Sequence, residues 1–207
     1  MSARGDAARS LTPLSMSLVN RFSLLAVVAV LACKAQDASP SVTAESSTAG
    51  ASMVAADLLK EIEGLETKVV DLAGAMPENK YNWQPDSART VRRVLLHIAA
   101  DNYVLPAMLG FPPDPAVGLT ADYETGVAYE NRELSKDSVV AELRRSFAFL
   151  KQSLGSATPT SMSAPVTMFG QPFTGQSGWI LTVTHIHEHL GQLIAYARTN
   201  GVKPPWS

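Results

Sequence analysis

The stretch SGWILTVTHIHEHLGQLIAYART, residues 177–199, decides the fold, because it joins a helical apolar stripe to two histidines one turn apart. On a helix, at about 100° per residue, its apolar side chains gather on one arc that should face a core. His185 and His189 lie on a second stripe with Gln192 and Tyr196. The helical wheel leaves open whether this second stripe points into the protein or is a solvated face. The apolar arc consists of Trp179, Val183, Ile186, Leu190, Leu193 and Ala197.

The histidine pair suggests a metal site, because neutral imidazole is one of the commonest metal ligands. Two histidines four apart on a helix, joined by one from a neighbouring helix, leave room for a water or a substrate on the metal. His97, in a second apolar segment, is the candidate third ligand. His187 lies almost opposite His189 on the wheel and is excluded from the cluster. We expect His187 to be partly exposed or hydrogen-bonded.

Asp101 follows His97 by one helical turn and lies on the apolar arc of its segment. A buried carboxylate needs a partner. Two interpretations remain open: Asp101 orients a histidine or binds the metal or its water, or it is a partly exposed residue near a helix end.

Three further segments carry helical apolar periods, at residues 54–76, 88–105 and 136–154. Pro77 ends the first, Pro106 stops or kinks the second, and Gly155 is a plausible C-cap of the third. Residues 107–134 show no period and indicate a long loop, while residues 156–176 indicate a loop or a small hairpin. The sequence therefore predicts an all-α four-helix bundle. The expected core positions are Leu58, Ile62, Leu65, Val69, Leu72 and Met76; Val91, Val94, Leu95, Ile98 and Leu105; and Val140, Leu143, Phe147, Leu150 and Leu154.

Residues 1–32 have the pattern of a signal peptide, with Arg21 before the uncharged run FSLLAVVAVLA and a small residue at the expected cut. Translation could start at Met1 or at Met16. Cys33 follows VLA as in a bacterial lipobox, which predicts lipidation of this cysteine. The alternative is an ordinary secretory signal with an incidental cysteine. Residues 33–53 are rich in Ser, Ala and Thr, and we expect them to form a flexible tether.

Composition excludes some functions. Removal of residues 1–32 takes away three arginines and one aspartate, which changes the formal net charge from −2 to −4. Without a basic patch, nucleic-acid binding is not expected. Since Cys33 is the only cysteine, the chain forms no intrachain disulfide. The sequence thus describes an exported protein of the cell envelope, anchored to a membrane by lipid, with one domain at residues 54–207.

Two segments resemble the DinB/YfiT-like superfamily. HIHEHLGQLIAYARTNGVKPPWS, residues 185–207, resembles its C-terminal signature, and YNWQPDSARTVRRVLLHIAADN, residues 81–102, resembles its Trp-x-Pro signature. The resemblance implies a four-helix bundle with up-down-down-up topology, and a divalent metal held by His97, His185 and His189. It also implies that Gly191 permits a close helix approach and that Gln192 hydrogen-bonds near the site. Homodimers are common in the family.

The expected function follows from the metal. Three neutral histidines suit zinc, nickel or iron(II), and such an ion activates a bound water or thiol. The first hypothesis is a metal-dependent hydrolase or thiol S-transferase acting on a small molecule, although export would separate the protein from the cytosolic thiol pool. The second is a non-catalytic, stress-related lipoprotein that binds a metal or a small ligand. The third is a structural bundle with a degenerate site.

Two features would separate the first two hypotheses, and the intact histidine triad argues against the third. An open pocket lined by Trp83, Gln192 and Tyr196 would favour an enzyme, and a metal sealed by a fourth protein ligand would favour a binding protein. Glu188 is a candidate general base, but a solvated side chain is the preferred interpretation.

Overall fold

The computed structural model describes residues 41–207, with side chains from Ala49 onward. The predicted signal peptide at residues 1–32 and the predicted lipidation site Cys33 lie outside the described residues. The elements are α1 (Ser41–Ala75), η1 (Glu78–Lys80), α2 (Val91–Met108), η2 (Pro115–Val117), α3 (Tyr123–Glu130), α4 (Lys136–Gly155), α5 (Pro159–Ser163), β1 (Pro165–Met168), β2 (Gln171–Thr174) and α6 (Gly175–Thr199).

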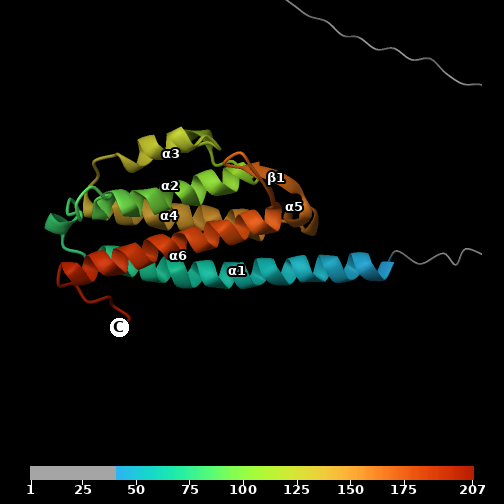
Figure 1. The fold of residues 1–207 in the computed structure, drawn as a ribbon, viewed down its shortest axis with the longest axis horizontal. Helices are drawn as coiled ribbons and strands as arrows, with labels where there is room; N and C mark the ends of the chain where they lie inside the picture. The colour runs from blue at the N-terminus through green and yellow to red at the C-terminus, as the bar shows by residue number, and fades with distance from the viewer. Residues whose placement is uncertain (1–40) are drawn as a thin grey trace, which may run out of the picture. The chain divides into compact units, whose positions relative to one another are not determined.

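Helices α1, α2, α4 and α6 lie side by side as a four-helix bundle (Figure 1). Figure 1 shows α2 and α4 running together in one direction, while α1 and α6 run in the other. The direction therefore changes between α1 and α2 and again between α4 and α6. This arrangement confirms the predicted all-α bundle and its up-down-down-up order. The short helix α3 lies over the outer side of α2.

The core is built from the apolar stripes that the sequence predicted. Leu58 and Val140, at the edges of two stripes, are only partly buried, and the other predicted core positions are buried. Thr90 and Ser135 cap α2 and α4 by accepting a hydrogen bond from a backbone N–H of the first turn. The caps and the buried apolar stripes therefore favour the same first residues for α2 and α4.

The first helix begins earlier than predicted. Residues 41–53 are the first part of α1, so the prediction of a flexible tether is wrong for them. Ala51, Val54 and Ala55 pack against the core, which lets the helix extend over a segment that is rich in small residues. Between residues 41 and 207, no helix has the length and apolarity needed to cross a bilayer.

Residues 107–134 are not one long loop, because they contain the eight-residue helix α3. Asp122 caps this helix by accepting a hydrogen bond from the backbone N–H of Glu124. At Gly126 the helix α3 packs on α2, and a Cβ at this position would make an ordinary van der Waals contact, 3.5 Å from the Val104 side chain. The sequence of α3 shows no apolar period that would predict a helix, because this short helix buries only one short face.

Two predicted helix ends shift by a few residues. Pro106 lies inside α2, which continues to Met108; the proline removes the N–H that would bond the carbonyl of Asn102, and the helix ends two residues later. Gly155 is the last residue of α4 and Ser156 is its C-cap. Residues 165–174 form the antiparallel hairpin β1–β2, which was one of the two alternatives for this segment.

Candidate metal centre

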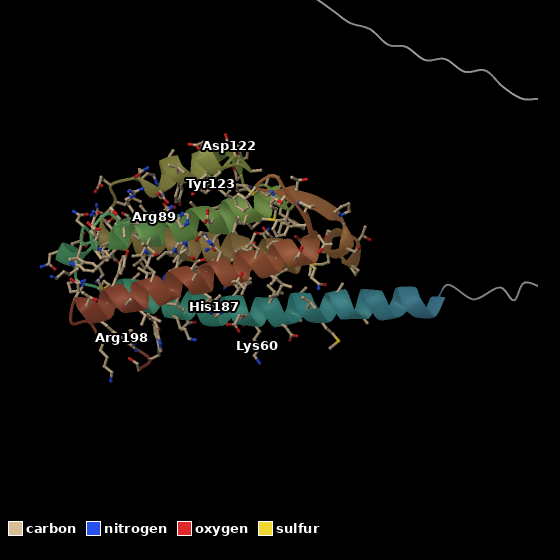
Figure 2. All side chains as sticks on the ribbon, viewed as in Figure 1. Lys60, Arg89, Asp122, Tyr123, His187 and Arg198 are labelled. Atoms are coloured by element: carbon tan, nitrogen blue, oxygen red, sulfur yellow. The ribbon has the colours of Figure 1, made fainter. Side chains whose placement is uncertain are left out.

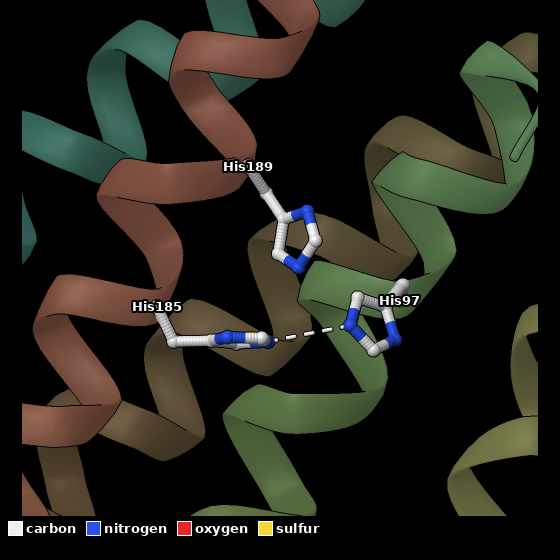
Figure 3. Close-up of side chains that lie close together, drawn as sticks. All are labelled: His97, His185 and His189. Carbon is white, nitrogen blue, oxygen red and sulfur yellow. Dashed lines mark hydrogen bonds between the residues drawn. The ribbon is translucent and has the colours of Figure 1, made fainter. Parts of the chain in front are cut away.

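His97 of α2 and His185 and His189 of α6 point into one space between the two helices (Figure 3). Each contributes a ring nitrogen, and the three nitrogens all lie within 4.8 Å of one another. Thr174 and Ser177 form a capping box that starts α6, and the apolar stripe of α6 faces the core. These two constraints turn the second stripe, which the wheel could not orient, toward α2.

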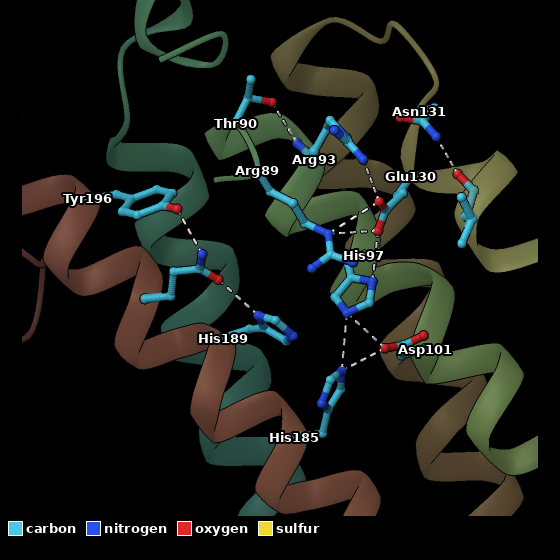
Figure 4. Close-up of polar contacts among 12 residues, drawn as sticks. Arg89, Thr90, Arg93, His97, Asp101, Glu130, Asn131, His185, His189 and Tyr196 are labelled. Carbon is cyan, nitrogen blue, oxygen red and sulfur yellow. Dashed lines mark hydrogen bonds and ion pairs between the residues drawn. The ribbon is translucent and has the colours of Figure 1, made fainter. Parts of the chain in front are cut away.

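His97 is held by Glu130, the last residue of α3. Its Nδ1 donates to Oε2 of Glu130 over 2.9 Å (Figure 4). An ionised carboxylate only accepts hydrogen bonds, so the proton of neutral His97 must lie on Nδ1. The lone pair is then on Nε2, the nitrogen that faces the other two histidines. This bond therefore places His97 in the tautomer that a metal requires.

Glu130 is buried, with 2 % of its surface exposed. Arg89 donates from Nε to both of its oxygens, at 3.2 and 3.0 Å, and Arg93 donates from Nη2 over 2.7 Å. Burial on its own would raise the pKa of Glu130, but the hydrogen bonds from His97, Arg93 and Arg89 outweigh it and lower this pKa to about 2. Glu130 therefore stays ionised beside His97.

His189 is fixed by a chain of hydrogen bonds along α6. Its Nδ1 donates to Oε1 of Gln192 over 3.0 Å, and Nε2 of Gln192 donates to the Tyr196 hydroxyl over 2.8 Å (Figure 4). The Tyr196 ring packs edge-on against Trp83, with ring centroids 5.2 Å apart. These three residues therefore orient His189, which agrees with the hydrogen-bonding role expected for Gln192.

The remaining nitrogen of His189, Nε2, is buried and has no hydrogen-bond partner. Burial is the main reason that the pKa of His189 is lowered to about 4, and the nearby histidines add to the effect, while Gln192 opposes it. His189 is therefore neutral near pH 7, with the lone pair of Nε2 directed at His97 and His185.

His185 is bound to Asp101. Its Nε2 donates to Oδ2 of Asp101 over 2.7 Å and lies 3.3 Å from Nε2 of His97. The same carboxylate oxygen lies 3.2 Å from Nε2 of His97. Asp101 is buried, so of its two interpretations the structure supports the one in which the carboxylate contacts the histidine cluster.

These nitrogens fit a divalent metal. Two nitrogens bound to one tetrahedral zinc at about 2.0–2.1 Å lie about 3.3 Å apart, which is the separation found between His97 and His185. The unpartnered Nε2 of His189 gives an independent indication, since a buried nitrogen without a hydrogen bond is costly unless something binds it. A metal would satisfy this nitrogen and replace the proton that His185 shares with Asp101.

A pocket of about 470 Å³ opens beside the cluster. Trp83, Gln192 and Tyr196 do not line this pocket, so they cannot form its wall as the sequence suggested. Instead, they lie on the side of His189 that carries Nδ1. The pocket is lined by Arg89, His97, Asp101, Leu105, Tyr123, Phe169, Leu181, His185, Glu188 and His189.

Three residues near the histidine pair lie outside the cluster. His187 is exposed and contacts Glu61 of α1 over 2.8 Å, and Figure 2 shows it beside α1, away from Arg89 and Tyr123. Glu188 is exposed at the pocket wall. Gly191 is also exposed, and a Cβ there would meet nothing within 4 Å, so the expected close helix approach at Gly191 is wrong.

Two residues of the site, Glu130 and Arg89, were not predicted from the sequence. Glu130 lies in the segment interpreted as a loop, and only the Asp122 cap signalled a helix there. Arg89 precedes α2 and belongs to no periodic stripe.

The fold and the site together define a class: four-helix bundles in which three histidines from two neighbouring helices converge beside a pocket. The family model of the DinB superfamily matches residues 53–193, and the chain belongs to this superfamily. No curated protein sequence matches the chain.

Solved structures share the fold at low sequence identity. A DinB-like protein from Bacillus cereus ATCC 10987 superposes with a TM-score of 0.60 at 17 % identity, over 72 % of this chain and 93 % of that chain. A DinB-like protein from Bacillus subtilis gives 0.55 at 16 % identity, over 71 % and 93 %. A variant of a mycothiol-dependent maleylpyruvate isomerase gives 0.55 at 12 % identity, over 67 % of this chain and 60 % of that chain. At these identities the likeness shows the fold alone.

Proposed function

We propose that the protein is an exported metal-dependent enzyme that holds one divalent ion through His97, His185 and His189 and converts a small molecule by hydrolysis or thiol S-transfer. The observation that carries the proposal is the unpartnered, buried Nε2 of His189, which is directed at the other two histidines beside an open pocket. Zinc, nickel and iron(II) all suit three imidazoles.

The bound ion would act as a Lewis acid that lowers the pKa of a water or thiol. The chain's own groups provide the rest. Glu130 and Gln192 hold His97 and His189 so that their Nε2 atoms face the same point. Asp101 lies on the pocket side of the cluster, where Oδ2 is placed to take up the proton that the activated water or thiol loses.

Hydrolysis is the preferred reaction. The mycothiol-dependent isomerase with the same fold shows that this bundle serves thiol chemistry elsewhere. An exported protein, however, would not meet the cytosolic pool of small thiols, whereas water is available in every compartment. The pocket is far larger than one water molecule needs, so a small molecule could reach the cluster, as a metal-dependent enzyme requires.

The test is elemental analysis of the purified protein together with a substrate screen. Wild type should hold about one divalent ion per chain, and His189→Gln should hold almost none, since a three-ligand site loses one ligand. His187→Gln is the matched control on the same helix and should keep the metal. Equal metal contents near zero in all three proteins would exclude the metal site. The metal-loaded protein is then screened against esters, phosphoesters, and thiols paired with electrophiles.

Export and lipidation are part of the proposal and rest on the sequence alone. Cys33 after VLA would carry the lipid and hold the domain at the outer side of a membrane. Cys33→Ser should release the protein from the membrane fraction of cells. Unchanged fractionation would exclude a lipid anchor at this cysteine. A homodimer stays a prediction from the family resemblance, which gel filtration tests.

A further inference from the structure

The pocket beside the histidines has a charged end and an apolar end. Arg89 lies next to Glu130, which in turn contacts His97. Leu105 of α2 and Leu181 of α6 each lie one turn beyond a site residue, Asp101 and His185 respectively, and they line the pocket on the other side of the cluster. A ligand in this pocket therefore has the cluster near its centre, a cation on one side and apolar side chains on the other.

Arg89 is available to a ligand although it also binds Glu130. Both of its hydrogen bonds to Glu130 use Nε. Figure 4 shows the end of the guanidinium directed into the space between α2 and α6. Its side chain is 32 % exposed and lines the pocket. The terminal N–H groups of a guanidinium match the two oxygens of a carboxylate.

Tyr123 connects Arg89 to the apolar end. It interacts with the Arg89 side chain, and its ring packs edge-on against Phe169, with centroids 6.3 Å apart. Tyr123 starts α3, and Phe169 lies at the tip of the β1–β2 hairpin. Arg89, Tyr123 and Phe169 therefore form one strip along the pocket, which we call the Arg–aromatic strip.

Phe169 has no evident role in the fold. The residue is 54 % exposed, and its backbone is in the left-handed region with φ of 52°. Gly170, with φ of 72°, completes a two-residue turn of the kind that favours Asn followed by Gly. A bulky aromatic residue is disfavoured at this position. An exposed ring held in an unfavourable conformation at the mouth of a pocket indicates a contact with a ligand.

The negative charges of the pocket limit the ligand to one anionic group. Asp101 and Glu188 line the same pocket as Arg89. In the metal-free protein, a second carboxylate or a phosphate dianion would therefore meet like charges and only one arginine. The pocket thus suits a monoanion with an uncharged body.

We propose that this pocket binds small monocarboxylates with an aromatic or branched apolar group, with the carboxylate at Arg89 and the apolar group against Tyr123 and Phe169. The proposal deepens the proposed function, on whose pocket it rests, by naming the substrate class.

Calorimetric titration of the purified protein, with one equivalent of zinc and again without metal, tests the proposal. Hydrocinnamate is the probe, and three relatives each change one property. Propionate lacks the ring, hydrocinnamamide lacks the charge, and benzylmalonate adds a second carboxylate. In the metal-free protein, hydrocinnamate should bind about tenfold more tightly than each relative, which corresponds to one lost ring contact or ion pair. Equal affinity for hydrocinnamate and propionate would overturn the proposal.

Variants at Phe169 and Arg89 test which side chains contact the ring and the carboxylate of the ligand. Phe169→Asn should weaken hydrocinnamate about tenfold and leave propionate unchanged, and it should fold well because Asn suits the turn. Trp206→Ala removes an exposed aromatic ring outside the pocket and is the matched control. Unchanged hydrocinnamate binding by Phe169→Asn would overturn the proposal.

Arg89→Gln should reduce the preference for hydrocinnamate over hydrocinnamamide, while Arg93→Gln should keep it. Both changes remove one partner of Glu130, but Arg93 does not line the pocket. An equal preference in wild type and Arg89→Gln would show that the carboxylate binds elsewhere and would overturn the proposal. Hydrocinnamate binding that depends on Phe169 and Arg89 in a protein that takes up no metal would support this proposal and overturn the proposed function.

Discussion

Glu130 accepts a hydrogen bond from Nδ1 of His97 over 2.9 Å, and this contact joins α3 to the histidine cluster. The carboxylate fixes the tautomer of His97, balances part of the charge of two arginines, and holds the end of α3 against α2. One buried side chain therefore links the fold of the crossing segment to the geometry of the site.

Glu130→Gln should weaken both metal binding and folding. The variant removes the negative charge that fixes His97, and such a loss costs about tenfold to a hundredfold in metal affinity. It also leaves Arg89 and Arg93 without their carboxylate. Because these arginines are 32 % and 39 % exposed, solvent screens them, and we expect a loss of about 2 kcal/mol in the free energy of unfolding. Competition with a chelator measures the affinity, and urea unfolding measures the stability.

Glu133→Gln is the control for this prediction. Glu133 pairs with Arg92, but its side chain is 82 % exposed. The change should alter the free energy of unfolding by less than about 0.5 kcal/mol and leave metal affinity unchanged. Equal effects of the two variants would contradict the role assigned to Glu130.

The metal-free protein should lose stability as the pH falls from 6.5 to 4. His189 has a pKa of about 4 in the folded protein and 6.5 as its ordinary value. Within this window the unfolded chain binds a proton that the folded protein excludes, so acid favours unfolding, and no further change from His189 is expected above pH 6.5. The loss should be about 3 kcal/mol. Chemical unfolding at several pH values, with a chelator present, measures it.

His189→Gln should flatten this pH dependence, whereas the matched change His187→Gln on the exposed side of α6 should preserve it. A second loss of stability is expected between pH 4.5 and 2. Because the pKa of Glu130 is lowered to about 2 in the folded protein, the unfolded chain takes up this proton at a higher pH than the folded protein does. A wild-type free energy of unfolding that stays constant from pH 6.5 to 4 would exclude a neutral, buried His189.

Much of the bundle could be predicted from the sequence, because each long helix carries its own apolar period. Ile62 and Leu65 in α1 or Leu143 and Phe147 in α4 are buried as the spacing requires. The starts and the short elements were less predictable. The first turns of α1 contain few large apolar residues, and α3 is too short to show a period.

The residues of the site likewise divide into those that could be predicted from the sequence and those that could not. His185 and His189 could be paired from their spacing, with His97 of another apolar segment as the candidate third ligand, and the family resemblance implied the same three histidines. Their supporting groups come from tertiary packing, which spacing along one segment does not reveal. Glu130 lies 33 positions after His97 and reaches it only because α3 folds back over α2. Trp83 and Tyr196 were expected at the pocket, but their contact with each other places them behind His189.

Tyr196→Phe should weaken metal binding with little effect on the fold. The hydroxyl accepts the hydrogen bond that fixes the Gln192 amide, and this amide holds Nδ1 of His189. Without it, Gln192 can turn and His189 loses its orientation, which should cost about tenfold in metal affinity. The packing of the ring against Trp83 remains, so we expect a loss of only about 1 kcal/mol in the free energy of unfolding.

Tyr103→Phe serves as the comparison, since Tyr103 is a buried tyrosine of α2 that packs against Phe149. This variant should leave metal affinity unchanged. Equal metal affinities in Tyr196→Phe and wild type would show that Gln192 orients His189 without help from the hydroxyl.

Two glycines of α6 should respond to alanine in opposite directions. Gly191 is exposed in the helix interior, and an added methyl group would have nothing within 4 Å, so Gly191→Ala should raise the free energy of unfolding by about 0.5–1 kcal/mol through helix propensity. At Gly175 a Cβ would lie 2.0 Å from the backbone oxygen of Ser161, which cannot move without shifting α5. Gly175→Ala should therefore lower the free energy of unfolding by about 1–3 kcal/mol. Urea unfolding measures the change in the free energy of unfolding for both variants. A lower free energy of unfolding in Gly191→Ala than in wild type would contradict the structure and support a close helix approach at Gly191.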